Sequence, residues 1–450
     1  MKPLGPDSIG QQSKPLSRRQ ALGLGLGGLS LGGLSVTALA QTSSPPAATL
    51  SKPQSAAPGD EQWNNLRSQL MLSPRWAYFD TATAGSATRA VLAAEYRALE
   101  ALHTDEQEFY AARYNAQAVQ QLCSRVAAWL NCSRDEITLT RGAQSGLEQF
   151  AQSFTFQPAL QPGNELVLCN QLPAAATTFW TQWARQRGLS IKTVMLPSPF
   201  LNEAQVVDSF SAALGASSRL MVFSHVQQTD GAILPVRALS RLARERKVLS
   251  IVDGTLSLGA IAISIADMEC DVYASSFCHW LDGPQHTGVL FVRPELHPQL
   301  PYLSDAMIEM LDLNTASWPN LIAKLPQDFL HFAPQFQALS AALSLQENLG
   351  KSLIAARIRE LCSYARLQLQ SANAQILTPA PGELWSNVLA VNAGRRNVSG
   401  LINYLRRTDQ VIVGGMNLAT GAALRMSFHI YNSFDDIDRL LRGLNRAMKS

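Results

Sequence analysis

The strongest constraint on the fold is a regular alternation of short apolar runs with long amphipathic stretches, which begins near residue 89. The amphipathic stretches, such as residues 89–102 and 236–247, carry apolar side chains at helical spacing. Several of the short runs are apolar throughout, as in strands that are buried on both faces. This alternation predicts an α/β fold with a mostly parallel central sheet and helices on both faces. The expected strands are residues 136–140, 165–169, 191–196, 219–226, 248–254, 271–277 and 288–293.

The pattern changes near residue 346, where helix-like segments enclose the strand-like runs VIVGG and LRMSFH. We therefore predict a smaller α+β C-terminal domain over 346–450, after an N-terminal segment and large domain over 63–345. The composition, with 46% hydrophobic and 16% charged residues, is that of an ordinary soluble globular protein.

The first 40 residues are typical of an export signal. SRRQAL precedes a glycine-rich, weakly apolar run that ends in Ala-Leu-Ala at 38–40. The paired Arg18 and Arg19 resemble the twin-arginine type, which predicts a Tat-exported, periplasmic protein cleaved near Ala40. An ordinary signal or an uncleaved anchor are the alternatives, and we expect no membrane span in the mature protein. Residues 41–62, rich in Pro, Ser and Ala, read as a flexible linker.

The charge distribution argues against a nucleic-acid partner. Residues 1–40 hold four basic residues and one acid, which account for the whole net charge of +3, so the rest of the chain is neutral. It has no basic block that could neutralise phosphates. The six cysteines form no C-x-x-C pair, so neither a redox motif nor a zinc site is indicated. Disulfides are compatible with export, but spacing cannot pair them.

Candidate ligand-binding residues follow the predicted strands, because ligands of open parallel sheets bind beyond the carboxyl ends of the strands. RGAQSGLEQF follows residues 136–140 as a turn that opens a helix, which suits a phosphate, although Gly142 could equally cap a turn. Asp253 ends a buried strand and needs a partner there, or else serves as a turn aspartate. The polar cluster SHVQQTDG, residues 224–231, fits a hydrogen-bond network with a structural role.

The stretch SSFCHWLDGPQH, residues 275–286, collects several reactive side chains. Cys278, Asp282 and His286 lie four residues apart, as metal ligands on one helical face would. Gly283 and Pro284 interrupt any such helix, so we expect no metal site.

The order of these motifs resembles that of a known family. WNNLRSQLMLSPRWAYFD, ITLTRGAQSGLE, SHVQQTDGAILPV, IVDG, CDVYASSFCHWLDGPQHTGVLFVR and LRMSFHIYNSFDDIDRL occur in the order of the class V aminotransferases. These are fold-type I proteins that depend on pyridoxal 5'-phosphate (PLP), and the resemblance lies near isopenicillin N epimerase-like proteins and cysteine desulfurases. It runs from about Trp63 to the C-terminus. It implies the fold-type I transferase fold and a homodimer.

The resemblance also implies a set of site residues. Asp253 would pair with the pyridine nitrogen of the cofactor, and Arg425 would bind the carboxylate of a small-molecule substrate. The remaining cofactor-binding positions would be Ala143, Gln144, Asn170, Gln228, Ser276 and Cys278. Of these, Ala143 and Gln144 lie at the phosphate cup, Ser276 adds a hydroxyl to it, and Cys278 replaces a family histidine. Gln228 would lie near the ring hydroxyl.

The family's Schiff-base lysine falls on His279, within the preserved frame S-x-x-H-W-L-x-G-P. Other departures occur in the same site. The ring-stacking position falls on Asn170 or Leu172, the usual Gln or His falls on Leu256, and the Gly-Thr phosphate element has no clear match in LHFAPQFQALS. No other lysine is an evident replacement: Lys247 precedes the strand that ends in Asp253, at the wrong end of the sheet, and Lys324 lies in a stretch that the sequence does not assign to an element.

Three interpretations follow. The first is an enzyme that holds PLP or pyridoxamine 5'-phosphate (PMP) noncovalently and uses His279 as a general base on an amino-acid-like substrate. The second is a catalytically silent class V pseudoenzyme that binds a carboxylate ligand or a protein partner. The third, an ordinary aminotransferase or epimerase, is disfavoured by the missing lysine. The sequence does not identify the substrate.

Overall fold

The computed structural model describes residues 58–300, 333–380, 382–385, 387–418 and 421–449. The predicted signal (1–40), most of the predicted linker and Lys324 lie outside these residues. Residues 58–62, the predicted end of the linker, instead begin helix α1 (Pro58–Gln69). No helix within the described ranges is both long and apolar enough to span a membrane.

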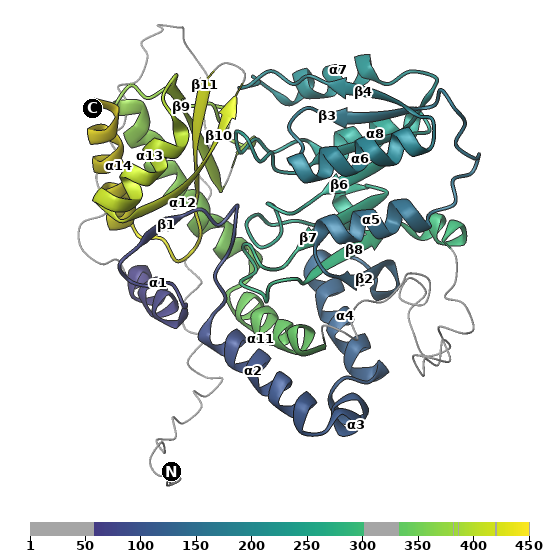
Figure 1. The fold of residues 1–450 in the computed structure, drawn as a ribbon, viewed down its shortest axis with the longest axis horizontal. Helices are drawn as coiled ribbons and strands as arrows, with labels where there is room; N and C mark the ends of the chain where they lie inside the picture. The colour runs from purple at the N-terminus through teal and green to yellow at the C-terminus, as the bar shows by residue number, and fades with distance from the viewer. Residues whose placement is uncertain (1–57, 301–332, 381, 386, 419–420, 450) are drawn as a thin grey trace, which may run out of the picture. The chain divides into compact units, whose positions relative to one another are not determined.

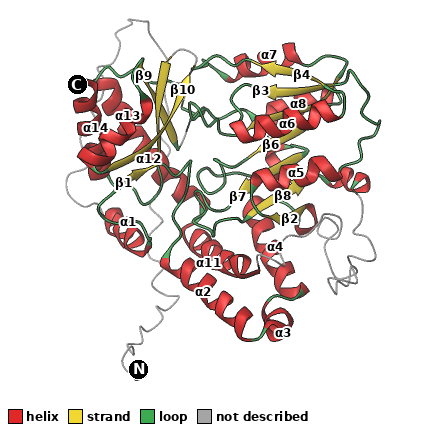
Figure 2. Cartoon of the chain, in the orientation of Figure 1, coloured by secondary structure: helices red, strands yellow, loops and turns green. Residues whose placement is uncertain are grey.

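The large sheet has seven strands in the order β2-β8-β7-β6-β5-β3-β4 (Figures 1 and 2). The pairs β3–β4, β3–β5, β5–β6 and β6–β7 are parallel, and β8 runs antiparallel to both of its neighbours. The predicted mostly parallel α/β sheet is therefore confirmed. Its strands are β2 (Ile137–Thr140), β3 (Glu165–Cys169), β4 (Ser190–Val194), β5 (Ser218–Ser224), β6 (Leu249–Asp253), β7 (Val272–Ser276) and β8 (Gly288–Val292).

Helices connect these strands and precede them. Local signals set several helix ends: the Asn115 side chain accepts from the backbone N–H of Ala118 at one end of α4, and Asn131 adopts a left-handed conformation (φ 55°) at the other. The helices of this part are α2 (Arg89–Thr104), α3 (Glu106–Glu108), α4 (Ala116–Leu130), α5 (Ala143–Ser153), α6 (Ala174–Gln186), α7 (Glu203–Ala213), α8 (Val236–Glu245), α9 (Ile265–Met268) and α11 (Ala333–Leu349).

A second sheet has four strands in the order β1-β10-β11-β9. The strand β1 comes from the N-terminal segment and pairs in parallel with β10, while the other pairs are antiparallel. Its strands are β1 (Ala77–Phe79), β9 (Val388–Gly394), β10 (Val411–Leu418) and β11 (Gly421–Ser427), with helices α12 (Lys351–Ser371), α13 (Val398–Tyr404) and α14 (Phe434–Lys449). The described residues form one compact unit, so the boundary at 345 stays a prediction.

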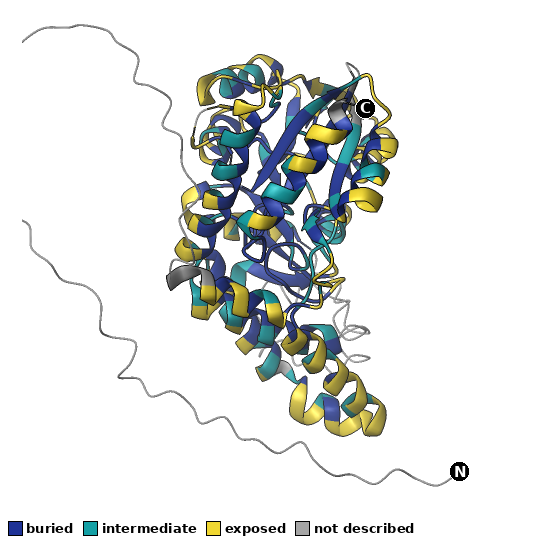
Figure 3. Cartoon of the chain, turned by 90° about the vertical axis from the view of Figure 1, so that its left-hand side faces the viewer, coloured by how far each residue is buried: buried dark blue, intermediate teal, exposed yellow. Residues whose placement is uncertain are grey.

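The cores of both sheets are apolar, and the exposed residues lie mainly on the outer faces of helices (Figure 3). Trp280 is fully buried, and its indole N–H donates to the carbonyl oxygen of Phe428 at 2.7 Å. This bond ties the loop after β7 to the end of β11. The loop that carries His279 is therefore anchored to the second sheet.

Candidate cofactor and active site

The carboxyl ends of four adjacent parallel strands bring the predicted residues to one edge of the large sheet. Asp253 and Ser276 are the last residues of β6 and β7, Asn170 follows β3, and Gln228 lies four residues beyond β5. This is the edge at which open α/β sheets bind ligands. The topology thus gathers side chains that lie far apart in the sequence.

Asp253 is a buried carboxylate whose hydrogen bonds come from its own turn. Its Oδ1 accepts from the backbone N–H of Thr255 at 2.9 Å and from the Thr255 hydroxyl at 2.5 Å. Burial raises the pKa of Asp253 above its usual value, while Thr255 and the nearby His279 lower it in part. A cationic group beside this carboxylate would offset the cost of burying its charge.

The start of helix α5 forms a close backbone cradle. Gly142 has φ 138°, which favours glycine, and its Cα would lie 2.5 Å from a Cβ placed on Gly288. The N–H of Ala143 donates to the Ser276 hydroxyl at 3.0 Å. The end of β7, the start of β8 and the positive end of an eleven-residue helix therefore meet at one point.

His279 lies in the loop after β7 and is buried at 9% exposure. Its Nδ1 lies 2.9 Å from the carbonyl oxygen of Thr81. Because a carbonyl oxygen only accepts, Nδ1 carries the proton and Nε2 keeps a lone pair. Burial lowers the pKa of His279, against the opposing effects of the Thr81 bond and of Asp253, so the imidazole is neutral at neutral pH.

Arg425 is buried and already engaged. Its Nη2 donates to Oδ1 of Asp80 at 3.0 Å and to the Thr83 hydroxyl at 2.6 Å. The charges of Arg425 and Asp80 both act on the pKa of His279, which places the pair in the same electrostatic environment as the imidazole. The predicted carboxylate-binding residue therefore lies at the site, with an internal carboxylate on it.

Asn170 and Gln144 form their hydrogen bonds with residues outside the predicted site. The Asn170 amide oxygen accepts from the N–H of Leu196, which holds this side chain against the chain beyond β4. Gln144 donates to Glu148 along α5 at 2.7 Å. Cys278 is half-buried, and burial raises the pKa of its thiol. Gln228 is half-buried, whereas its neighbour Gln227 is fully buried.

The segment after β1 supplies functional positions that sequence reasoning missed. Asp80, Thr81 and Thr83 contact Arg425 or His279, and Gly85 packs against the carbonyl oxygens of Cys278 and His279. A cue was present: the polar, glycine-bearing run DTATAGSAT directly follows a short apolar run, as the other site segments do.

The described lysines do not take the place of the missing one. Lys351 donates to the carbonyl oxygen of Ile263 and lies over the ring of Trp129. Lys247 follows α8, before the amino end of β6, as predicted from the sequence, and Lys192 lies within the edge strand β4. All six cysteines are free. Among the described residues, no cluster of three His, Cys, Asp or Glu side chains could hold a metal ion.

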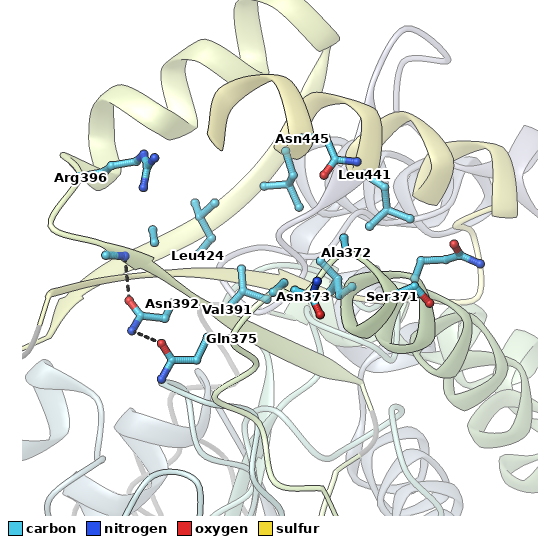
Figure 4. Close-up of a pocket in the computed structure, with 16 residues that line it drawn as sticks. Ser371, Ala372, Asn373, Gln375, Val391, Asn392, Arg396, Leu424, Leu441 and Asn445 are labelled. Carbon is cyan, nitrogen blue, oxygen red and sulfur yellow. Dashed lines mark hydrogen bonds between the residues drawn. The ribbon is translucent and has the colours of Figure 1, made fainter. Parts of the chain in front are cut away.

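A cavity of about 600 Å³ lies away from these residues (Figure 4). It is formed by the end of α12, by β9 and β11, and by α14, with Leu369, Val391, Leu424 and Leu441 among its apolar lining. None of the predicted site residues lines it. The cavity is therefore not part of the candidate site.

The comparisons with known proteins agree with this geometry. The model of the family described as Aminotransferase class-V matches residues 77–440, and the chain therefore belongs to the class V aminotransferase family, a family of PLP-dependent enzymes. It is 27% identical over 400 residues to an isopenicillin N epimerase from Amycolatopsis lactamdurans, covering 86% of this chain and 99% of the epimerase. It is 27% identical over 397 residues to a cysteine desulfurase from Serratia proteamaculans (strain 568), covering 83% and 93%.

Solved structures confirm the fold. An apo cysteine desulfurase from Thermococcus onnurineus NA1 matches with a TM-score of 0.73 at 18% identity, covering 86% of this chain and 98% of that one. A mutant of C-DES with glycine covalently linked to its PLP cofactor matches with a TM-score of 0.71 at 18% identity, covering 85% and 98%. The predicted family and fold-type I architecture are thus confirmed.

The residues present fit a B6 cofactor in part. The buried carboxyl of Asp253, whose ionisation is penalised, suits a protonated ring nitrogen. The cradle of Gly142, Ala143 and Ser276 suits a phosphate. His279 cannot form the Schiff base that a lysine amine forms. A B6 cofactor at this site would therefore have no Schiff-base link to residue 279.

Proposed function

We propose that the protein binds PLP or PMP noncovalently and acts on a small substrate that carries an amine and a carboxylate, with His279 as the general base. The observation that carries this proposal is the Nδ1 contact of His279 with the Thr81 carbonyl, which leaves Nε2 as a neutral, oriented proton acceptor.

Each residue then has a defined task. Asp253 holds the ring nitrogen in its protonated form, and Ser276 with the start of α5 holds the phosphate. The cofactor supplies an electron-withdrawing ring that makes a carbon next to the substrate nitrogen more acidic. His279 accepts a proton at Nε2, and the Thr81 carbonyl stabilises the resulting imidazolium through Nδ1–H. Arg425 orients the substrate carboxylate.

Absorbance and induced circular dichroism of the purified protein, before and after adding PMP or PLP, test this proposal. We expect an induced signal that disappears on dialysis, and a much weaker one in Asp253→Asn. His279→Ala should keep cofactor affinity but lose turnover, whereas His103→Ala, on the exposed surface of α2, should change neither. An absent signal with both cofactors, or equal turnover in His279→Ala, would contradict the proposal.

A second candidate function is a silent class V protein that binds a carboxylate ligand or a protein partner. Two observations favour it: Asp80 already occupies Arg425, and the Asn170 amide is bonded to Leu196 in the place where a ring-stacking group is expected. This candidate requires no induced signal with either cofactor at millimolar concentration.

Export and assembly belong to the same proposal. The paired Arg18 and Arg19 and the apolar run after them support export to the periplasm by the Tat machinery, with cleavage near Ala40. Family resemblance supports a homodimer. Mass spectrometry of the N-terminus after fractionation and light scattering of the purified protein test these two points. An N-terminus upstream of residue 38 or a monomer would contradict them.

A further inference from the structure

Arg425 and Asp80 form a buried ion pair for which the second sheet leaves room. The side chain of Arg425 is 4% exposed and that of Asp80 is 16% exposed. Gly414 lies directly opposite Arg425 in the β10–β11 register. A Cβ at Gly414 would meet Oδ1 of Asp80 at 2.5 Å and Nη2 of Arg425 at 2.9 Å. The pair therefore depends on glycine at this position.

The guanidinium is only partly used. Nη2 makes both of its bonds on one side, to Asp80 and Thr83, while Nε is buried and has no hydrogen-bond partner among the described residues. Within the part of the chain that the structure describes, the Asp80 side chain accepts only with Oδ1, which also accepts from the Thr83 hydroxyl at 2.9 Å. A carboxylate can engage two edges of an arginine at once, and Asp80 does not. Arg425 therefore keeps an unsatisfied donor that a better-placed carboxylate could take.

We propose that Asp80 is a specificity-determining residue, an internal competitor that a ligand carboxylate must displace from Arg425. This inference rests on the proposed function, because it concerns the substrate-binding side of the same site. With Asp80 in place, the pair is neutral, and adding a second carboxylate would bury a net negative charge. Carboxylate ligands therefore bind the wild-type protein more weakly than the arginine alone would allow.

Two probes that differ mainly in the amino acid part isolate this effect. One is PMP, and the other is N-(5'-phosphopyridoxyl)-L-alanine, which adds the carboxylate through a stable secondary amine. The dissociation constant of each is measured by titration calorimetry on the purified protein. We expect the preference for the alanine conjugate to rise by about 10- to 100-fold in Asp80→Asn, the range for a charge-assisted hydrogen bond.

The controls separate the inference from the proposed function. Asp208→Asn removes an exposed carboxylate on α7 and should leave the preference unchanged. Asp80→Asn with Arg425→Gln should lose the gain, because the gain requires the guanidinium. If both probes bind and Asp80→Asn leaves their ratio unchanged, the inference fails and the proposed function stands. If neither probe binds any variant, the proposed function fails and takes the inference with it.

A second measurement does not need the cofactor. The midpoint of thermal unfolding is recorded with L-alanine and, at the same ionic strength, with ethylamine. A stabilisation by alanine that is larger in Asp80→Asn than in the wild-type protein supports the inference, and equal shifts overturn it. Asp80→Ala serves in the same comparison if Asp80→Asn does not fold.

Discussion

Gly85 offers a direct test of how the N-terminal segment holds His279. A Cβ at this position would lie 2.1 Å from the carbonyl oxygen of Cys278 and 2.2 Å from that of His279. Ordinary contacts begin at 3.4 Å, so Gly85→Ala forces the two segments apart by about 1.3 Å. The obstacle is backbone on both sides, so no side chain can swing away to relieve it.

The cost has two parts. Overpacking a well-packed interior costs about 1 to 3 kcal/mol. Stretching the 2.9 Å contact between Nδ1 of His279 and the Thr81 oxygen by that amount breaks it, which costs about 1 kcal/mol more. We therefore expect Gly85→Ala to lower the free energy of unfolding by about 2 to 4 kcal/mol and to release the His279 tautomer.

Urea unfolding followed by tryptophan fluorescence measures the first effect, and ¹⁵N spectra of histidine-labelled protein measure the second. Gly400→Ala is the matched control. It lies in helix α13, where the nearest atom to a new Cβ is 3.8 Å away, so it should stabilise the protein by about 0.5 to 1 kcal/mol. If Gly85→Ala unfolds within 0.5 kcal/mol of wild type (about the error of such measurements) and keeps the Nδ1–H tautomer, the packing argument is wrong.

Three further predictions follow from buried groups. Burial lowers the pKa of His225 to about 4. As the pH drops below about 6.5, this histidine is protonated in the unfolded chain but stays neutral in the folded protein, so the free energy of unfolding falls. Between pH 7 and 5.5 the wild type should lose about 1 kcal/mol more than His225→Asn in urea melts, and parallel curves would contradict this. Burial raises the pKa of every cysteine thiol. Ellman's reagent at pH 8 should therefore titrate all six thiols only after denaturation, and rapid labelling of the native protein would contradict the burial of these thiols. Trp280→Phe leaves the Phe428 oxygen unpaired and should destabilise the protein by about 1 to 3 kcal/mol in the same melts, whereas a change below about 0.5 kcal/mol would contradict the anchoring bond.

Periodicity was enough to predict the large sheet. Six of its seven strands are short, mostly buried runs that can be recognised locally, whereas the edge strand β4 is largely exposed. The rule that ligands bind at the carboxyl ends of strands then placed Asp253 and Ser276 at one edge. The strand β1 was not predicted because it is only three residues long and gains its partner from β10. Strand pairing between such distant segments leaves no local period in the sequence.

The contacts that define the site are equally non-local. His279 and Thr81 are 198 residues apart, and Arg425 and Asp80 are 345 residues apart. The role of Arg425 as the carboxylate-binding residue stays a prediction of the resemblance. The tautomer of His279 and the ion pair of Arg425 with Asp80 depend on long-range backbone positions that no single stretch of the sequence encodes. The bond from Asn170 to Leu196 has the same origin, since it depends on how β3 and β4 are aligned.

The pairing of β1 with β10 also sets an order of events during synthesis. All seven strands of the large sheet lie before residue 300 and are synthesised first. The strand β1 cannot form its pairing until residues 411–413 of β10 have been synthesised. Until then Asp80 and Thr81 have no fixed place, and the loop that carries His279 lacks the neighbours that orient it. A message truncated before residue 411 would therefore still encode the whole large sheet, yet its product could not assemble the site.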